Sequence, residues 1–261
     1  MSDAATSPEL QKLAHSVGVS PDRLSGLAAV PPDDLRLLRS QIAEALFQAD
    51  KPRFARMAAL SSAVPVAVAA KVTEHALPPL LAARTAELID PARAAELVSR
   101  LSDGYLAEVS AAMDAARAPD VVRRIPPDRV AKVAVELARR EEWVVIGAFV
   151  VHISDEALAA SIRALDGEQL LRVGYVLDEK SRLDEISAIV TDDQRDEMLA
   201  AAAKFELWTE LDDLLVHLGA TEASWLAARF SVAPDSVRSA ASAAAKSGQL
   251  STQALGLLNA G

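Results

Sequence analysis

The chain has 261 residues, 51% of them hydrophobic and 25% charged, which indicates a folded protein rather than a disordered one, with enough chain for one large or two small domains. It contains no cysteine, which excludes disulfides, thiol catalysis and thiolate metal sites and fits a reducing compartment. The formal net charge of −10 disfavours broad non-specific binding to nucleic acid or to anionic membranes.

The composition also favours helices over strands. Aromatic residues make up only 4% of the chain and alanine is abundant, a combination that suits closely packed helices. The N-terminal stretch is polar and lacks the apolar core of a signal peptide, and the longest apolar run, 143–151, is well short of the roughly 20 residues that span a bilayer. We therefore expect a cytoplasmic protein without a membrane span.

The first recognisable pattern is LAHSVGVSPDRLSGL, residues 13–27, which has the rhythm of a helix-turn-helix: a short helix, a Gly-Val turn, a Ser-Pro start and a second helix. Segment 1–30 holds two cations against three acids, namely Lys12 and Arg23 against Asp3, Glu9 and Asp22. Because DNA binding needs several cations on the exposed face, a capped helical hairpin is favoured here, within a predicted N-terminal segment 1–50 of helical hairpins.

Further segments begin with the same chemistry. Residues 30–48 start with Val-Pro-Pro-Asp, and Pro65, Pro91, Pro126 and Asp155 each precede apolar residues at helical spacing. Proline is favourable in the first helical turn, and an acidic side chain there caps free N–H groups. The pattern predicts helices of about 10–14 residues each, a usual helix length.

An internal repeat organises the middle of the chain. Segment 89–130 aligns with 153–195 at an offset of 64, and segment 140–153 aligns with 205–218 at an offset of 65. The second alignment places Trp143 on Trp208 and His152 on His217. Repeats of this length are typical of stacked helical hairpins.

We therefore predict an all-α fold of about a dozen or more helices, with stacked hairpins forming a superhelical, solenoid-like array over 51–218 and a C-terminal helical segment over 219–261. The repeat units are about 89–152 and 153–217. The apolar stretch 143–153 could be a buried strand, but its repeat partner has a helical pattern, so we expect both to be helices.

Phrases such as IDPARAAELVSRL, RRIPPDRVAKVAVEL and LDGEQLLRVGYVL resemble the superhelical cytoplasmic N-terminal domain of bacterial magnesium transporters of the MgtE type, over roughly 60–218. In that family short helices with similar starts stack into a curved solenoid. No transmembrane segment follows here, and there is no nucleotide-sensing module, so the resemblance implies the fold alone.

Residue patterns that would indicate chemistry are absent. The four histidines, at 15, 75, 152 and 217, show no metal-ligand spacing, and the sequence has no GxSxG, GxGxxG or P-loop motif. Acidic pairs such as Asp33–Asp34, Asp192–Asp193 and Asp212–Asp213 could attract a divalent cation, but acids at helix starts are ordinary caps. We predict no enzyme activity, no cofactor and no metal site.

Two repeat-matched pairs are interpreted as structural. Trp143 and Trp208 are expected to anchor the core of each repeat, and His152 and His217 to end buried helices with local hydrogen bonds. The apolar helix 143–153 could instead line a pocket for a lipid or pigment or face another subunit, although a central core helix is favoured.

The opening pattern has a counterpart at 226–250, where Pro234 and Asp235 align with Pro21 and Asp22. Segment 221–261 holds three cations against two acids, so a DNA-binding interpretation would use Arg229, Ser236 and Arg238.

The function that this sequence favours is a non-enzymatic scaffold or protein-interaction module, with a protein partner that the sequence does not identify. The alternatives are a carrier of an apolar ligand and a DNA-binding regulator that acts through its helix-turn-helix-like ends.

Overall fold

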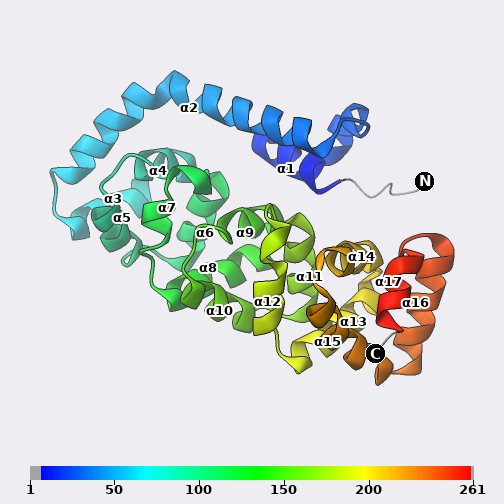
Figure 1. Ribbon diagram of the computed structural model, residues 1–261. Coiled ribbons are helices and arrows are strands. Elements are labelled where there is room, and N and C mark those ends of the chain that lie inside the picture. The colour runs from blue at the N-terminus through cyan, green and yellow to red at the C-terminus, as the bar shows by residue number, and fades with distance from the viewer. Residues whose placement is uncertain (1–6, 260–261) are drawn as a thin grey trace. The chain divides into compact units, whose positions relative to one another are not determined.

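The computed structural model describes residues 7–259. Residues 1–6, at the start of the segment analysed for a signal sequence, and residues 260–261, at the end of the predicted C-terminal segment, lie outside the described residues. Within residues 7–259 the chain forms seventeen α-helices, three 3₁₀-helices (η) and no β-strand (Figure 1), which confirms the all-α prediction.

The helices group into two compact units, residues 1–161 and residues 162–261. The first contains α1 (Pro8–Val17), η1 (Pro21–Leu27), α2 (Pro32–Ser62), α3 (Val66–Ala76), α4 (Pro79–Ala86), α5 (Pro91–Val98), α6 (Asp103–Ala112), η2 (Ala115–Arg117), α7 (Pro119–Val122), α8 (Pro127–Arg139), α9 (Trp143–Phe149) and α10 (Asp155–Ala164), which continues past residue 161. The second contains α11 (Gly167–Val176), η3 (Lys180–Arg182), α12 (Leu183–Ile189), α13 (Asp192–Phe205), α14 (Trp208–His217), α15 (Ala220–Ser231), α16 (Asp235–Ser247) and α17 (Thr252–Leu258).

Within each unit, helices pack on the helix two places further along the chain. In the first unit α2 contacts α4, α4 contacts α6 and α6 contacts α8, while α3 contacts α5 and α5 contacts α7. In the second unit α11 contacts α13, α13 contacts α15 and α15 contacts α17. Contacts between alternate helices bury one face of each helix against two neighbours.

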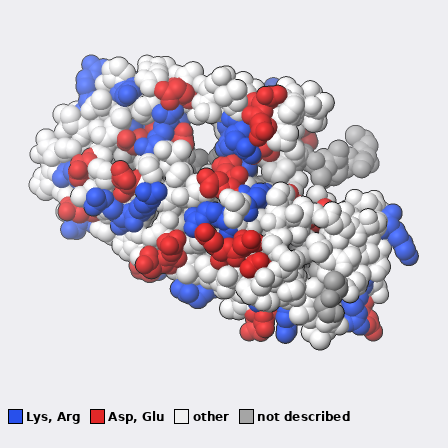
Figure 2. All heavy atoms as spheres, in the orientation of Figure 1, with Lys and Arg blue, Asp and Glu red and all other residues white. Residues whose placement is uncertain are grey.

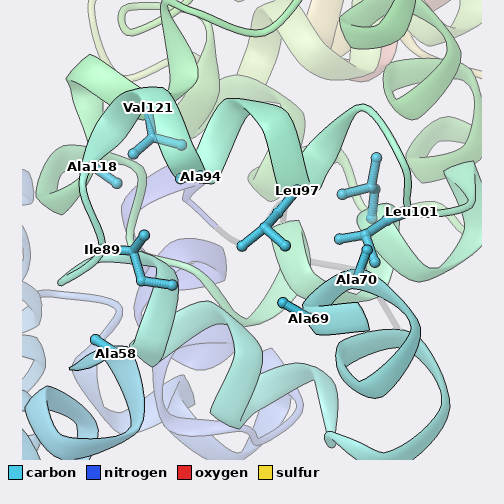
Figure 3. Packing of buried hydrophobic residues seen from close by; sticks show 10 residues of the cluster. Ala58, Ala69, Ala70, Ile89, Ala94, Leu97, Leu101, Ala118 and Val121 are labelled. Carbon is cyan, nitrogen blue, oxygen red and sulfur yellow. The ribbon is translucent and has the colours of Figure 1, made fainter. Parts of the chain in front are cut away.

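Small side chains make this packing close. A core cluster of the first unit combines five alanines with Ile89, Leu97, Leu101, Leu106 and Val121 (Figure 3). The alanines of this cluster come from several helices, among them Ala58 of α2, Ala69 and Ala70 of α3 and Ala94 of α5. Alanine keeps helix axes close together, so this core needs few aromatic side chains.

The predicted helix starts agree with local capping chemistry. Pro65 and Pro126 directly precede the first residues of α3 and α8, Pro91 is the first residue of α5, and Asp155 is the first residue of α10. At α5 the Asp90 side chain accepts a hydrogen bond from the Arg93 backbone N–H. These starts are fixed by residues within one turn, which is why the sequence reveals them.

The helix α2 departs from the expected length of 10–14 residues, since it runs for 31 residues and continues through Pro52. It therefore also continues through the domain boundary predicted between residues 50 and 51. Among its described side chains only Leu35, Phe47, Phe54 and Ala58 are buried, and Figure 2 shows an opening beneath the helix.

Arg117 contacts two residues in the middle of α2. The Arg117 guanidinium lies 2.6 Å from a Glu44 carboxylate oxygen and 4.2 Å from the centre of the Phe47 ring.

A side chain in the first turn of three helices binds the carboxyl end of an earlier helix. Arg93 donates to the carbonyls of Ser61 and Val64, and Arg129 donates to those of Val98 and Leu101. Gln194 donates to Ile162 O at 2.6 Å and to Leu165 O at 3.0 Å. The last carbonyls of a helix lack intrahelical partners, so these three residues perform the same task at intervals along the chain.

This arrangement supports a prediction for Arg129→Met, which removes the donor but keeps most of the apolar stem. We expect a loss of about 2 kcal/mol in the free energy of unfolding, since the carbonyls of Val98 and Leu101 lose a charged partner. Urea denaturation measures the loss, and the exposed Arg123, changed to Met, is the control. An equal effect of both changes would show that the hydrogen bonds from Arg129 to the carbonyls of Val98 and Leu101 do not stabilise the fold.

Two non-glycine residues have a left-handed backbone conformation, Glu141 with φ 60° and Glu206 with φ 58°. They are separated by 65 residues, which is the offset of the second repeat alignment. Glu141 follows α8 and precedes α9, and Glu206 follows α13 and precedes α14. The same backbone turn thus joins the corresponding helix pairs.

Glycine at position 206 would adopt this left-handed conformation without steric cost, whereas alanine would keep the cost that a Cβ imposes. Left-handed backbone costs roughly 1–2 kcal/mol for residues with a Cβ. We expect the Gly variant to be more stable than the Ala variant by about 1 kcal/mol, the reverse of their order inside a helix. Thermal denaturation of the two variants checks the order, and a more stable Ala variant would contradict it.

Candidate protein-interaction site

A groove of about 750 Å³ opens on the second unit between the α12–α13 turn and one face of α15. The turn contributes residues 188–192 and Arg195 of α13. The helix α15 and the residue after it contribute Trp225, Ala228, Arg229 and Val232. We call this the 225 groove; α12 and α13 each contact α15, as Figure 1 shows.

Capping of α13 forms the first wall. The Thr191 side chain accepts from the Gln194 backbone N–H at 3.2 Å, and the Gln194 side chain accepts from the Thr191 N–H at 3.1 Å. This reciprocal box fixes the angle at which the chain enters α13. It leaves Asp192 and Asp193 exposed in the first turn, where the helix dipole favours acidic side chains.

The second wall depends on a tryptophan outside the buried stripe of α15. That stripe consists of Ala223, Leu226, Ala227 and Phe230. Trp225 does not belong to it and keeps 38% of its surface exposed. An exposed indole is a large contact surface, and tryptophan is among the residues most often found at interaction hot spots.

Arg195 packs against the indole of Trp225. Its guanidinium lies 5.2 Å from the Trp225 ring, donates to Asp192 at 2.6 Å and donates to the Ser187 carbonyl at 3.0 Å. The Arg195 side chain is only 10% exposed. A cation stacked on an aromatic face and held by two further groups gives the groove a preformed floor.

A second ion pair edges the groove. The Arg229 Nε donates to Asp196 at 2.8 Å, and a second guanidinium nitrogen contacts the other carboxylate oxygen. The Arg229 hydrogen bond lowers the pKa of Asp196, and the Asp196 hydrogen bond raises the pKa of Arg229, with Asp192 and Asp193 adding to the rise. Both groups are therefore charged at neutral pH.

The groove can hold apolar side chains. Val232 is 69% exposed, the largest exposed fraction among the large hydrophobic residues of the second unit, and Ile189 lies on the opposite wall. A small apolar surface with an aromatic anchor and a charged edge is the usual composition of a protein-docking site.

The repeat-matched tryptophans occupy equivalent positions but differ in burial. Trp143 is the first residue of α9 and is half-buried, and Trp208 is the first residue of α14 and is 3% exposed. Neither belongs to the 225 groove.

The repeat-matched histidines also differ. His217 is the last residue of α14 and is exposed, with its Nδ1 2.7 Å from the Asp213 carbonyl oxygen. His152 is half-buried in the turn after α9.

The helix-turn-helix-like segments place few cations on a free surface. In 13–27 the second element is η1, a 3₁₀-helix, rather than an α-helix. In 226–250 it is α16, where Arg238 donates to the carbonyls of Ser231 and Ala233 and pairs with Asp235. Arg229 pairs with Asp196, and Ser236 is exposed. Figure 2 shows few charged side chains over α16 and α17.

The apolar helix of 143–151 is covered. Val145, Ile146, Gly147 and Val150 are buried, and no residue of this stretch is exposed. The helix α9 packs against α8 and α1. Its apolar side chains thus contribute to the core of the first unit.

Within residues 7–259 no three His, Asp or Glu side chains lie close enough to hold a metal ion, the acidic pairs included. In the same residues no helix has the length and apolar character needed to cross a membrane.

Trp225 and Arg195 were not among the residues predicted from the sequence to form a site. The indole could have been found, because a helical projection of 220–231 places Trp225 away from the apolar stripe. The groove itself could not be predicted, because its walls are thirty or more residues apart in the chain and meet only when α13 and α15 pack.

Comparison with protein families, curated proteins and solved structures finds no match to this chain.

Proposed function

We propose that this protein is a non-enzymatic helical-repeat scaffold of the cytoplasm that binds another protein in the 225 groove. The observation that carries the proposal is the exposed Trp225, which lines the 225 groove and contacts the guanidinium of Arg195. Rigid aromatic anchors of this kind supply much of the binding energy in protein interfaces.

The repeated architecture supports a scaffold role. The packing of alternate helices, the shared task of Arg93, Arg129 and Gln194, and the left-handed turns at Glu141 and Glu206 are features expected of stacked helical hairpins. We propose that the hairpins form a superhelical array, in line with the resemblance to the MgtE-type domain. Such arrays commonly serve as binding surfaces.

Affinity capture of the tagged full chain from its native cells tests the proposal. We expect a protein partner to co-purify with the wild type and to be lost in Val232→Asp, which places a charge in the groove. The control is Val72→Asp, because Val72 is an exposed valine of α3 in the other unit, 56% exposed against 69% for Val232. Capture that is identical for all three proteins, or no partner at all, would overturn the proposal.

A further inference from the structure

We infer that the 225 groove selects a basic amphipathic segment, one that presents apolar side chains flanked by Lys or Arg. This inference rests on the proposed function and names the class of partner. The inference rests on two observations. The carboxylates at the groove edge are more exposed than the guanidinium groups paired with them, and the whole second unit is acidic.

The charges at the groove edge are arranged with acids outward and cations inward. The Asp192 side chain is 65% exposed, whereas its partner Arg195 is 10% exposed. The Asp196 side chain is 43% exposed, whereas its partner Arg229 is 32% exposed. Asp193 adds a third exposed carboxylate beside them. An approaching segment therefore meets carboxylates before guanidinium groups.

The unit that carries the groove is strongly acidic. Residues 162–261 hold nine Lys and Arg against sixteen Asp and Glu, so this unit accounts for −7 of the net charge of −10. A field of this sign attracts cationic segments and repels nucleic acid and anionic lipid surfaces.

The walls of the groove offer apolar surface that a bound segment must cover. Trp225, Ile189 and Val232 offer apolar surface. A segment with cations alone would leave this surface in water, and an apolar segment without cations would desolvate the carboxylates without a partner. Both requirements are met by a helix or turn with an apolar face and basic flanks.

Designed amphipathic peptides test the inference on the full chain. The series keeps one leucine face and grades the flanking residues from all Glu to all Lys, and fluorescence anisotropy measures the Kd of each labelled peptide. We expect the all-Lys peptide to bind about tenfold or more tightly than the all-Glu peptide, and this preference to shrink as salt is raised.

Two variants locate the binding. The double change Asp192→Asn and Asp193→Asn should weaken the all-Lys peptide several-fold, and Trp225→Ala should abolish its binding. The matched control is Asp33→Asn and Asp34→Asn, an exposed acidic pair in the first turn of α2. Circular dichroism of each variant confirms that it is folded, and Trp225→Phe provides a milder change that should retain part of the binding.

The outcomes separate this inference from the proposed function. Equal or tighter binding of the all-Glu peptide, no binding by any peptide, or equal effects of the two acidic double changes would overturn the basic partner class. If the peptide results overturned the basic partner class but Val232→Asp still lost the partner captured from cells, the proposed function would stand without this inference. Binding of anionic vesicles at the groove in place of peptides would overturn both.

Discussion

Replacing Gly167 by alanine is expected to destabilise the second unit by about 3 kcal/mol, at the upper end of the usual cost of overpacking a core. A Cβ on Gly167 would lie 2.3 Å from the Met198 backbone nitrogen, 2.4 Å from the Glu197 carbonyl carbon and 2.6 Å from the Glu197 Cβ. Two of these three atoms belong to the main chain, so α11 and α13 must move apart. The Gly167 N–H also donates to the Glu197 carboxylate at 3.2 Å, a bond that such a movement would lengthen.

Urea denaturation of the full chain measures this loss, and Gly256→Ala is the matched control. Gly256 lies inside α17 with no atom within 4 Å of an added Cβ. Alanine there should stabilise the protein by about 0.5–1 kcal/mol, because glycine is a poor helix former. A Gly167→Ala protein as stable as the wild type would contradict the close approach of α11 and α13.

Substitution of Trp208 is expected to lower the stability of the protein, whereas substitution of Trp225 is expected to abolish partner binding. Trp208 is 3% exposed at the start of α14, so Trp208→Ala should cost about 3–5 kcal/mol through lost burial and the cavity left behind. Trp225 is 38% exposed, so Trp225→Ala should cost about 1 kcal/mol or less while abolishing partner binding.

Thermal denaturation together with co-purification of the partner checks both tryptophans. The milder change Trp208→Phe should keep the protein folded and leave binding intact, which separates loss of structure from loss of the site. A Trp225→Ala protein that unfolds as readily as Trp208→Ala would show that the indole at 225 supports the core instead.

Local chemistry explains which parts of the fold could be predicted from the sequence. Pro91 and Asp155 begin helices because proline and aspartate suit the first turn whatever surrounds them. The offset of 65 residues that aligns Trp143 with Trp208 also aligns Glu141 with Glu206, both left-handed. The two left-handed residues thus lie at positions that the predicted repeat register treats as equivalent.

Long-range packing explains what the sequence did not reveal. A domain boundary was predicted between residues 50 and 51, yet α2 continues through it and through Pro52. Phe54 and Ala58 beyond this point are buried, Ala58 in a core cluster of the first unit. Segment 21–27 became a 3₁₀-helix without buried residues instead of a second α-helix. The 225 groove arises where two separated helices meet, and no local pattern indicates such a meeting.

Photo-cross-linking in living cells tests the central proposal most directly, because it reports contact at one chosen residue. A benzoylphenylalanine placed at Val232 should cross-link to a protein partner, whereas the same group at Val72, an exposed valine of α3, should not. We expect a defined cross-linked product at position 232 that disappears when Trp225 is also changed to alanine. No product at 232, or the same product at 72, would contradict the assignment of the 225 groove as the docking site.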